Sequence, residues 1–517
     1  VIFNLILLSF FLSSDVSFAQ SIVKWGPSYK IKGGADMYKF LGVLDNSYYF
    51  VFKPNSDNIV QRFNFRHELV SEEKFKFVRN RERLKIHGAI ETAAGSYFYM
   101  HQFSRKYKEW ILHVSEVNNG NISRPEEAYF QSFDLPNTQL NKAYRNFEYD
   151  FGPVDGGLIL SEDSTKVAFV NIIPDTDLSG EDVVAVAVFD ETMKLIWKAV
   201  FYYDFGGRRY DIERQVVTND GEIYLVGRVD KFKREDRGRN VNERKLPKFD
   251  YYLYHINEEG ILDSKIDLGV RNAPMDVALF FPDRNTDQFL MAGFYTDDTY
   301  KFRLKGIFFS YGDENFRSTS VRMHEFDERF LSGLISSKAI EKGKGLSSTY
   351  RIKDILNYRD GSIGFIAENS YTSDFSQTDI YGRWFQRVVF VSDEIIIPKF
   401  NSDGDLINIQ KIPKDFSSEV YTSTSYSMAV HSGKTYLIFN DYKSREERAA
   451  IDKRGSVFTD LVVLDELGRI EGVQTLFTNR EINYDFFPAL SDYNHDVFLI
   501  GSKRGNRFSM SSLEFGQ

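Results

Sequence analysis

Eight histidines are the residues best suited to bind zinc or to transfer a proton near neutral pH, and they are spread along the chain. They are His67, His87, His101, His113, His255, His324, His431 and His495. A helical zinc site such as H-E-x-x-H needs two histidines one turn apart, and no pair has that spacing. The sequence therefore predicts no metal site.

Other catalytic motifs are also missing. There is no G-x-S-x-G nucleophile turn, and Gly343-Lys344-Gly345 is too short for a phosphate-binding loop. Residues 401–405 start like a calcium loop, but their glycine comes too early and position 12 is Ile412 instead of Glu. We interpret these residues as a hairpin turn. We expect no cofactor. The chain has 74 Asp and Glu residues, so a catalytic acid-base pair cannot be picked out from the sequence. In the absence of a recognisable catalytic motif, we favour a non-enzymatic role.

Positive charge is concentrated in two stretches that we expect to be loops. Residues 228–248 hold nine basic and four acidic residues, and residues 443–454 hold five basic and three acidic ones. Such a patch attracts an anionic glycan, lipid headgroups or an acidic protein over a reach of about 8 Å. The alternative is a solvated loop that gains little by ordering. The candidate binding residues are Lys231, Lys233, Arg234, Arg237, Arg239, Arg244, Lys245, Arg445 and Arg448.

A third stretch, residues 371–385, combines aromatic rings with a guanidinium group in another predicted loop. This mixture is typical of interface hot spots and of platforms that stack on sugars. The alternative is that the rings pack beneath their own loop. The candidate binding residues here are Phe375, Tyr381, Arg383, Trp384 and Phe385.

The overall composition limits the possible partners and the source of stability. A net charge of −9 argues against nucleic acid as a partner. Cysteine is absent, which excludes disulfides and thiolate metal ligands, so stability must come from the core. The 47 Phe and 30 Tyr residues can build one, because each buried ring hides about 150–250 Å².

Residues 1–19 have the pattern of a secretory signal peptide. An apolar run through Leu12 precedes Ser17-Phe18-Ala19, with small residues at the positions that signal peptidase inspects. The run is shorter than the roughly 20 apolar residues that span a bilayer. We expect removal of residues 1–19, no transmembrane segment afterwards, and a single domain, residues 20–517, in the periplasm or outside the cell.

The stretch from Tyr210 to Leu268 predicts the elements that position these candidates. It contains two hairpins of alternating apolar and polar residues, one of which turns at Asn219-Asp220-Gly221. A four-stranded sheet of this kind buries both faces only between two similar sheets. The chain supplies these by repeating the unit, as propellers do.

We predict eight such units, with seven as the alternative. In the second unit, three strands are predicted: Gly88–Thr92, Tyr97–Phe103 and Trp110–Val117. The last unit also has three, Phe487–Leu490, Val497–Gly501 and Arg507–Phe515, and Ser21–Ile31 can supply its fourth. The predicted fold is all-β, a single β-propeller of about eight four-stranded blades whose ring is closed by N- and C-terminal strands. Residues 327–342 have helical spacing instead.

One hairpin resembles a known family. The sequence LSEDSTKVAFV, residues 160–170, is similar to the S-x-D-x-x-x-[IV]-A-[FY] line of WD40-like repeats in TolB-type periplasmic propellers. The match covers one hairpin and lacks the family's Pro and Gly in the turn. The resemblance implies an exported β-propeller.

The predicted connections differ between the two sides of the disc. The first and third connections of each blade lie on one side, the tight face, where the predicted turns are short. Longer connections, residues 230–248, 370–386 and 441–456, lie on the other side, the elaborated face. Long segments on a rigid scaffold usually carry binding. We therefore expect an exported scaffold that binds an envelope protein or glycan there, with a glycoside hydrolase, a polysaccharide lyase or a lectin as alternatives.

Overall fold

The computed structural model describes most of the chain between residues 22 and 514. The described ranges are 22–30, 36–53, 58–75, 78–79, 82–104, 108–135, 157–173, 182–203, 208–233, 249–267, 274–280, 289–296, 303–312, 318–378, 384–420, 423–442, 457–488, 491–494, 497–504 and 507–514. The structural statements below concern these residues.

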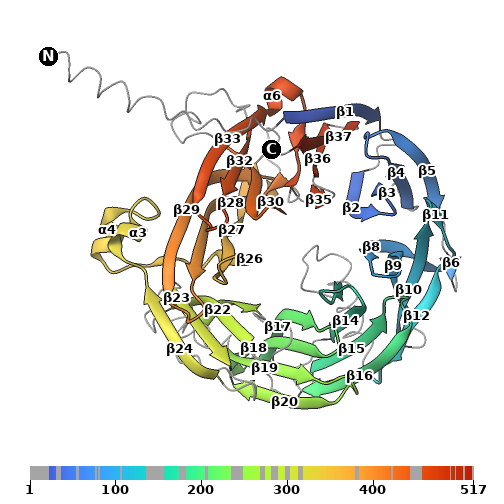
Figure 1. Cartoon of the computed structure of the whole chain (residues 1–517), viewed down its shortest axis with the longest axis horizontal. Coiled ribbons are helices and arrows are strands. Elements are labelled where there is room, and N and C mark those ends of the chain that lie inside the picture. Colours follow the sequence, from blue (N-terminus) through green and yellow to red (C-terminus); the bar gives the residue numbers. More distant parts are fainter. Residues whose placement is uncertain are drawn as a thin grey trace.

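Eight sheets of four or five strands stand around a central axis and form a ring (Figure 1). In each, the strands follow one another antiparallel from the axis to the rim, except where the ring closes. The prediction of an all-β, eight-bladed propeller is therefore confirmed. The seven-bladed alternative is set aside.

The first four complete blades account for the chain up to Asp267. The first contains β2 (Asp36–Leu44), β3 (Ser47–Lys53), β4 (Asn58–Phe63) and β5 (Leu69–Phe75). The second contains β8 (Lys85–Glu91), β9 (Ser96–Ser104), β10 (Glu109–Asn118), β11 (Asn121–Ile122) and β12 (Glu126–Ser132). The third contains β13 (Leu158–Leu160), β14 (Lys166–Ile173), β15 (Asp182–Asp190) and β16 (Leu195–Tyr203). The fourth contains β17 (Arg208–Val217), β18 (Ile223–Lys233), β19 (Phe249–Ile256) and β20 (Leu262–Asp267).

Three further blades follow. The fifth contains β21 (Pro274–Phe280), β22 (Phe289–Thr296), β23 (Arg303–Gly312), β24 (Ser318–Glu325) and β25 (Leu346–Ser347). The sixth contains β26 (Tyr350–Asn357), β27 (Ile363–Thr378), β28 (Trp384–Phe400) and β29 (Leu406–Ser418). The seventh contains β30 (Tyr426–His431), β31 (Lys434–Asp441), β32 (Phe458–Leu464) and β33 (Ile470–Thr478). Outside the blades, β6 (Val78–Arg79) pairs with β7 (Glu82–Arg83).

The eighth blade joins the two ends of the described chain. It contains β34 (Asp485–Phe486), β35 (Asp492–Asn494), β36 (Val497–Arg504), β37 (Arg507–Glu514) and β1 (Ile22–Lys30). β1 pairs antiparallel with β37, so the predicted closure is confirmed. Phe508 then packs against Phe50 of the first blade, with ring centroids 4.8 Å apart. This packing continues the core across the join.

The core lies between neighbouring blades, because both faces of each sheet carry apolar side chains. Val183 and Phe189 in the central strand β15 are fully buried. Between the second and third blades, the Tyr129 and Phe169 rings meet edge to face with centroids 5.6 Å apart. Both aromatic pairing and area burial stabilise such a contact, which explains how the chain can fold without disulfides.

On the tight face, several turns between the third and fourth strands of a blade are stabilised in the same way, by an Asn or Asp side chain that accepts backbone N–H groups. In the turn from Asn257 to Ile261, Asn257 Oδ1 accepts the backbone N–H groups of Glu259 and Ile261. Gly260 there has φ +73°, a conformation that costs glycine nothing. Asn64, Asp190, Asn401 and Asp465 start equivalent turns. The reading of residues 401–405 as a hairpin turn is confirmed.

Three sequence-based assignments were wrong. The second blade has a fourth strand, β12, which the prediction missed because its alternating residues are mostly exposed. On the inner side of the eighth blade the described strands are β34 and β35, whereas the predicted strand Phe487–Leu490 falls between them and its last two residues lie outside the described ones. The predicted helix over 327–342 is two short helices, α3 (Glu328–Leu331) and α4 (Ser337–Glu341), interrupted where Gly333 adopts φ +86°.

A third short helix, α6 (Asn479–Ile482), begins with a capping box between Thr478 and Glu481. Within the described ranges, no helix is long and apolar enough to cross a membrane.

Candidate functional site

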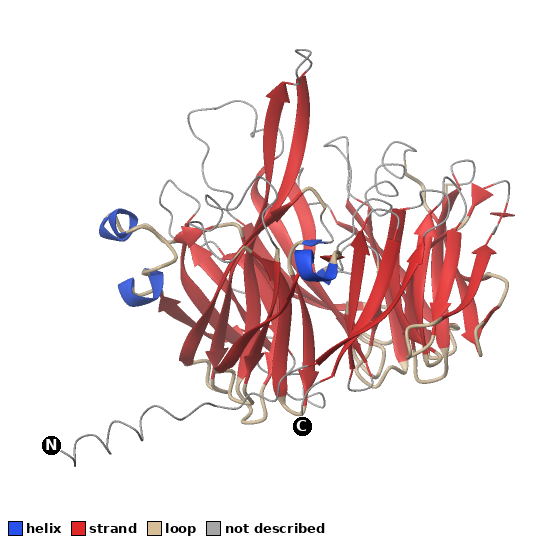
Figure 2. Ribbon diagram, turned by 90° about the horizontal axis from the view of Figure 1, so that it is seen from above, coloured by secondary structure: helices blue, strands red, loops and turns tan. Residues whose placement is uncertain are grey.

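The elaborated face carries one extension that is built from strands. β27 has 16 residues and β28 has 17, whereas β30 in the next blade has six. Their register is unbroken from the pair Ser370 and Ser392 to the pair Thr378 and Trp384. The pair of long strands that rises above the disc in Figure 2 is this hairpin.

The outer part of the hairpin is a two-stranded ribbon among the described strands. On one side, pairing with β26 ends at Asn369. On the other side, pairing with β29 ends at Phe390. We call residues Tyr371–Thr378 with Trp384–Val389 the ribbon. A free two-stranded hairpin is marginal in water, so its root must be held firmly.

The predicted aromatic site belongs to this ribbon, which corrects its assignment as a loop. Phe375 lies in β27, and Trp384 and Phe385 lie in β28, because cross-strand pairing continues where the sequence is too polar to signal a buried strand. Tyr381 and Arg383 lie outside the described residues.

Most residues of the predicted basic site lie outside the described part of the chain. Lys231 and Lys233 lie at the end of strand β18 and not in a loop, because that strand continues to Lys233. The remaining basic candidates fall outside the described residues: Arg234, Arg237, Arg239, Arg244, Lys245, Arg445 and Arg448.

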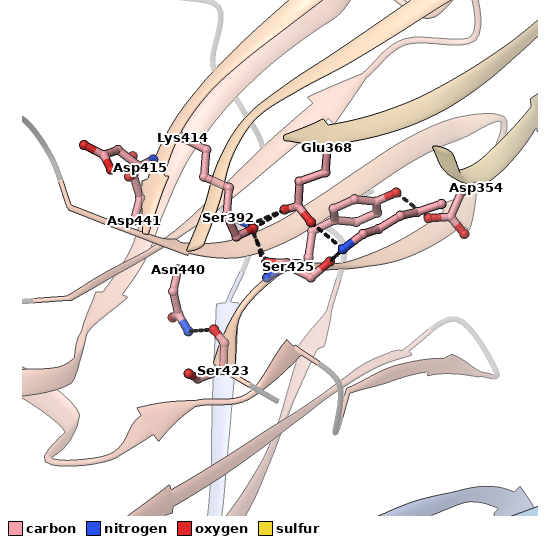
Figure 3. A network of polar contacts seen from close by, with 11 residues as sticks. Asp354, Glu368, Ser392, Lys414, Asp415, Ser423, Ser425, Asn440 and Asp441 are labelled. Atoms are coloured by element: carbon pink, nitrogen blue, oxygen red, sulfur yellow. Dashed lines mark hydrogen bonds and ion pairs between the residues drawn. The ribbon is translucent and has the colours of Figure 1, made fainter. Parts of the chain in front are cut away.

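A buried cluster of charges lies at the root of the ribbon (Figure 3). Glu368 in β27 accepts a hydrogen bond from Lys414 Nζ of β29 at 2.5 Å through Oε1. Its Oε2 accepts from Lys353 Nζ of β26 at 2.5 Å. Ser392 Oγ of β28 donates to Glu368 Oε1 and accepts from Lys414 Nζ. The cluster therefore joins all four strands of the blade just below the ribbon.

The cluster is charged although it is buried. The side chains of Lys414 and Glu368 are both 0% exposed. Burial opposes ionisation of Glu368, but the ammonium groups of Lys414 and Lys353 overcome it and hold its pKa at about 2. Burial lowers the pKa of Lys414, and Glu368 offsets part of that effect. The two ammonium groups thus keep the carboxylate ionised.

Ser425 connects the cluster to the next blade. Its backbone N–H donates to Ser392 Oγ at 3.1 Å, and its C=O accepts from Lys414 Nζ at 2.6 Å. Its Oγ accepts from Lys353 Nζ at 2.5 Å. The φ angle of Ser425 is +71°, which is unfavourable for a serine, so these three contacts hold a strained backbone in place.

This geometry favours a structural role for the cluster over nucleophilic chemistry. Ser392 is 1% exposed, and its Oγ is occupied by Glu368, Lys414 and a backbone N–H. Ser425 is more accessible, but an ammonium group is a donor only and cannot take its proton. Lys353 already donates to Glu368 while it meets Ser425. The arrangement can hold and orient strands. The carboxylate that accepts the Ser392 hydroxyl, Glu368, has its pKa held at about 2 and is therefore a weak base.

A second contact lies on the inner strands beside the cluster. Tyr426 donates its hydroxyl to Asp354 Oδ2 at 2.5 Å, and burial raises the pKa of Asp354. Arg214 of the fourth blade donates from Nη2 to the Ile352 carbonyl at 2.7 Å. The inner ends of three blades are thereby joined near the elaborated face.

Acidic residues continue the network into the seventh blade. Asp441 Oδ1 accepts the backbone N–H of Asp415 at 2.8 Å. Burial raises the pKa of Asp441 to about 6, and the carboxylates of Asp460 and Asp415 add to the shift. Among the residues that the structure describes, no three His, Asp or Glu side chains are placed to hold a metal ion.

The sequence did not point to this cluster. Glu368 and Lys414 are 46 residues apart, and nothing in their spacing pairs them. One signal existed: Glu368 ends the apolar run Ile363–Ala367, where a charge at a central strand position requires a buried partner.

No known family model matches the sequence, and no curated protein resembles it. Three solved structures that resemble the fold are distant in sequence. The β-propeller domain of the Trilobed protease from Pyrococcus furiosus has TM-score 0.34 and 10% identity, over 83% of this chain and 93% of that one. Prolyl oligopeptidase B from Galerina marginata has TM-score 0.41 and 7% identity, over 92% of this chain and 56% of that one. The WD40 domain of SCAP from fission yeast has TM-score 0.35 and 8% identity, over 96% of both chains. Such distant likeness carries no functional argument, and the fold assignment rests on the sheets described above.

Proposed function

We propose that the protein is an exported, non-enzymatic binding or scaffolding module of a cell envelope, which holds a partner protein on its elaborated face. The observation that carries this proposal is the ribbon, residues Tyr371–Thr378 with Trp384–Val389, which extends beyond the sheet that supports it. The propeller core does not need this extension. Long segments on a rigid scaffold are where binding residues concentrate.

The root of the ribbon supports the same proposal. Glu368 and Lys414 are fully buried, and with Lys353 and Ser425 they fix the hairpin to two blades. A segment that is held rigidly before binding loses less conformational entropy when a partner docks. The cluster therefore makes the ribbon a preorganised surface.

The export assignment rests on the sequence of residues 1–19 and on the resemblance of residues 160–170 to exported propellers. Both point to an envelope protein as the partner class. Fractionation of the source cells, with detection of the chain by antibody, tests this assignment directly. Recovery of the protein in the cytoplasmic fraction would contradict it.

The experiment that tests the binding role is a pull-down from native envelope extract. The bait is the full chain, beside a variant in which residues 372–390 are replaced by Asn-Gly, a dipeptide that favours a tight hairpin between Tyr371 and Val391. We expect a stoichiometric protein that is captured by the full chain and lost with the variant.

The matched control replaces residues 234–248 with a short Gly-Ser link and keeps the ribbon. Thermal unfolding of each bait shows that the ring is intact. Equal capture by the full chain and the ribbon variant, or capture by neither, would overturn the proposal. Loss of capture with the loop variant alone would move the site to the basic loop.

A further inference from the structure

The inner edge of the ribbon is an open strand edge. β26 lies beside β27 only as far as the pair Tyr350 and Asn369. The Ser370 N–H still reaches the carbonyl of Thr349 at 3.1 Å, and beyond it no described strand pairs with this side of β27. β28 covers the opposite side up to Thr378.

The register shows which backbone groups point to this open edge. In a strand, the N–H and C=O of one residue point to one side, and those of the next residue point to the other. Ser370 points to the β26 side, and no register shift follows it. Thr372, Asp374, Ser376 and Thr378 therefore direct one N–H and one C=O each toward the open edge. Together they form a row of backbone donors and acceptors about 20 Å long.

The edge lacks the usual protection against pairing. Proteins guard open edges with lysine, proline or bulges. The segment Tyr371–Thr378 contains no lysine and no proline, and its register has no bulge. The pairing of β1 with β37 closes the ring, but every blade still ends in edge strands, such as β20. The ribbon differs from these edges because it extends beyond the strands that flank it in its own blade.

We propose that β27 accepts an extended segment of a partner protein as an added strand along Thr372–Thr378. This inference rests on the proposed function and names the binding mode of the same ribbon. The added strand continues the line of β26 above the disc, and main-chain hydrogen bonds supply the affinity, as in other cases of strand addition.

Charge narrows the chemistry of the partner segment. Asp374 is exposed and is the one charged side chain in the segment Tyr371–Thr378. A lysine or arginine opposite or diagonal to it stabilises the pairing, whereas a like charge opposes it. A second copy of this chain, paired antiparallel along most of the edge, brings two Asp374 carboxylates opposite or diagonal to each other. The partner is therefore a different protein with a basic residue in its extended segment.

Two variants separate backbone pairing from side-chain docking. Thr372→Pro with Ser376→Pro removes two N–H groups that point to the open edge, and leaves the N–H groups that bond to β28. Thr372→Ala with Ser376→Ala removes the same side chains and keeps both N–H groups. The probe is a phage-displayed library of random twelve-residue peptides, selected on the full chain.

We expect enriched peptides to carry Lys or Arg and to bind the alanine variant as well as the full chain. Loss of two donors should weaken their binding to the proline variant by about tenfold or more. Asp374→Lys, which leaves the backbone unchanged, should weaken it as well, and it replaces the proline variant as the test if that variant unfolds. No enrichment, or equal binding to every variant, would overturn strand addition.

Three further outcomes are distinct. If sedimentation shows a dimer that the proline variant loses and the alanine variant keeps, the occupant is a second copy and the inferred partner is wrong. If the envelope partner is lost when residues 372–390 are replaced but is kept by the proline variant, strand addition is wrong and the binding role stands. If replacement of the ribbon leaves capture intact, the proposed function itself is wrong.

Discussion

The sixth blade is tied to the seventh at both of its ends by a lysine and a carboxylate, and the two ends differ in their access to water. At the elaborated end, Lys414 and Glu368 are both 0% exposed. At the tight end, Lys399 is 4% exposed but its partner Asp360 is 38% exposed. Lys414 also donates to the Ser425 carbonyl, and Lys399 to the Leu467 carbonyl. Both lysines thus connect two blades. Only at the elaborated end are both charges of the ion pair shielded from water, so they must be balanced by protein groups.

The two carboxylates reach a similar pKa for different reasons. Asp360 has a pKa of about 2 chiefly because the Ser362 hydroxyl donates to it, with help from Lys399 against a modest effect of burial. Glu368 has a pKa of about 2 although burial strongly favours its neutral form. The tight end therefore resembles a surface ion pair with local hydrogen bonds. At the elaborated end, the ionised state of Glu368 depends on both of its lysine partners.

The largest expected effect comes from breaking the buried pair. Glu368→Gln leaves Lys414 buried without the carboxylate that pairs with it and removes one charged acceptor from Lys353. We expect the free energy of unfolding, measured by urea denaturation, to fall by about 3–5 kcal/mol.

Two controls make this prediction specific. Glu471→Gln breaks a pair with Lys434 in which both side chains are about one third exposed, and should cost no more than about 0.5 kcal/mol. Glu368→Leu combined with Lys414→Met removes both buried charges and should recover most of the loss. A loss below about 1 kcal/mol for Glu368→Gln would show that the cluster is not a structural clamp.

A smaller effect is expected at the tight end. Lys399→Met keeps the aliphatic stem beside the Tyr358 ring, which the ammonium group approaches to 4.4 Å from the centroid. It removes the bonds to Asp360 and to the Leu467 carbonyl, each 2.9 Å long. Water can replace Lys399 at Asp360, so we expect a loss of about 1–2 kcal/mol in the same urea assay. A loss as large as that of Glu368→Gln would remove the distinction between the two ends.

The fold could be predicted from sequence because its signals are local. Alternating residues and turns such as Asn257-Glu258-Glu259-Gly260 locate strands one hairpin at a time. The prediction failed where that signal is weak. β12 is mostly exposed, and β34 and β35 have only two and three residues, so none of them shows a clear apolar alternation.

The site could not be predicted to the same extent because its contacts are not local. Residues 371–378 are polar, and only the cross-strand register shows that they continue β27. Lys414 in β29 contacts Glu368 in β27 across the intervening strand β28, and Lys353 contacts it from β26 on the other side. A single sequence shows that Glu368 needs a buried partner, because it follows an apolar run, but it does not show which residue that partner is. The predicted side of the disc was nevertheless the side on which the ribbon lies.

The last prediction concerns a half-buried carboxylate, Asp441, whose pKa is raised, whereas that of Glu368 is lowered. Asp441 has a folded pKa of about 6, above the ordinary value of 3.8, so its ionisation destabilises the folded state as pH rises from about 4 to 6. Asp441→Asn keeps an acceptor for the Asp415 N–H and does not titrate. We expect it to stabilise the fold by about 1 kcal/mol at pH 7.5, with no gain at pH 4.

Asp465 at the tight end provides the matched comparison for Asp441. Burial opposes its ionisation, but backbone N–H groups and the Arg469 guanidinium overcome this and lower its pKa. Its ionised form therefore stabilises the fold above about pH 4, and that contribution disappears as pH falls through the lowered folded pKa. Asp465→Asn should destabilise the protein at pH 7.5, opposite in sign to Asp441→Asn. Thermal unfolding from pH 4 to 8 measures the stability of both variants. If both substitutions change stability at pH 7.5 in the same direction, burial and pairing do not explain the difference between the two carboxylates.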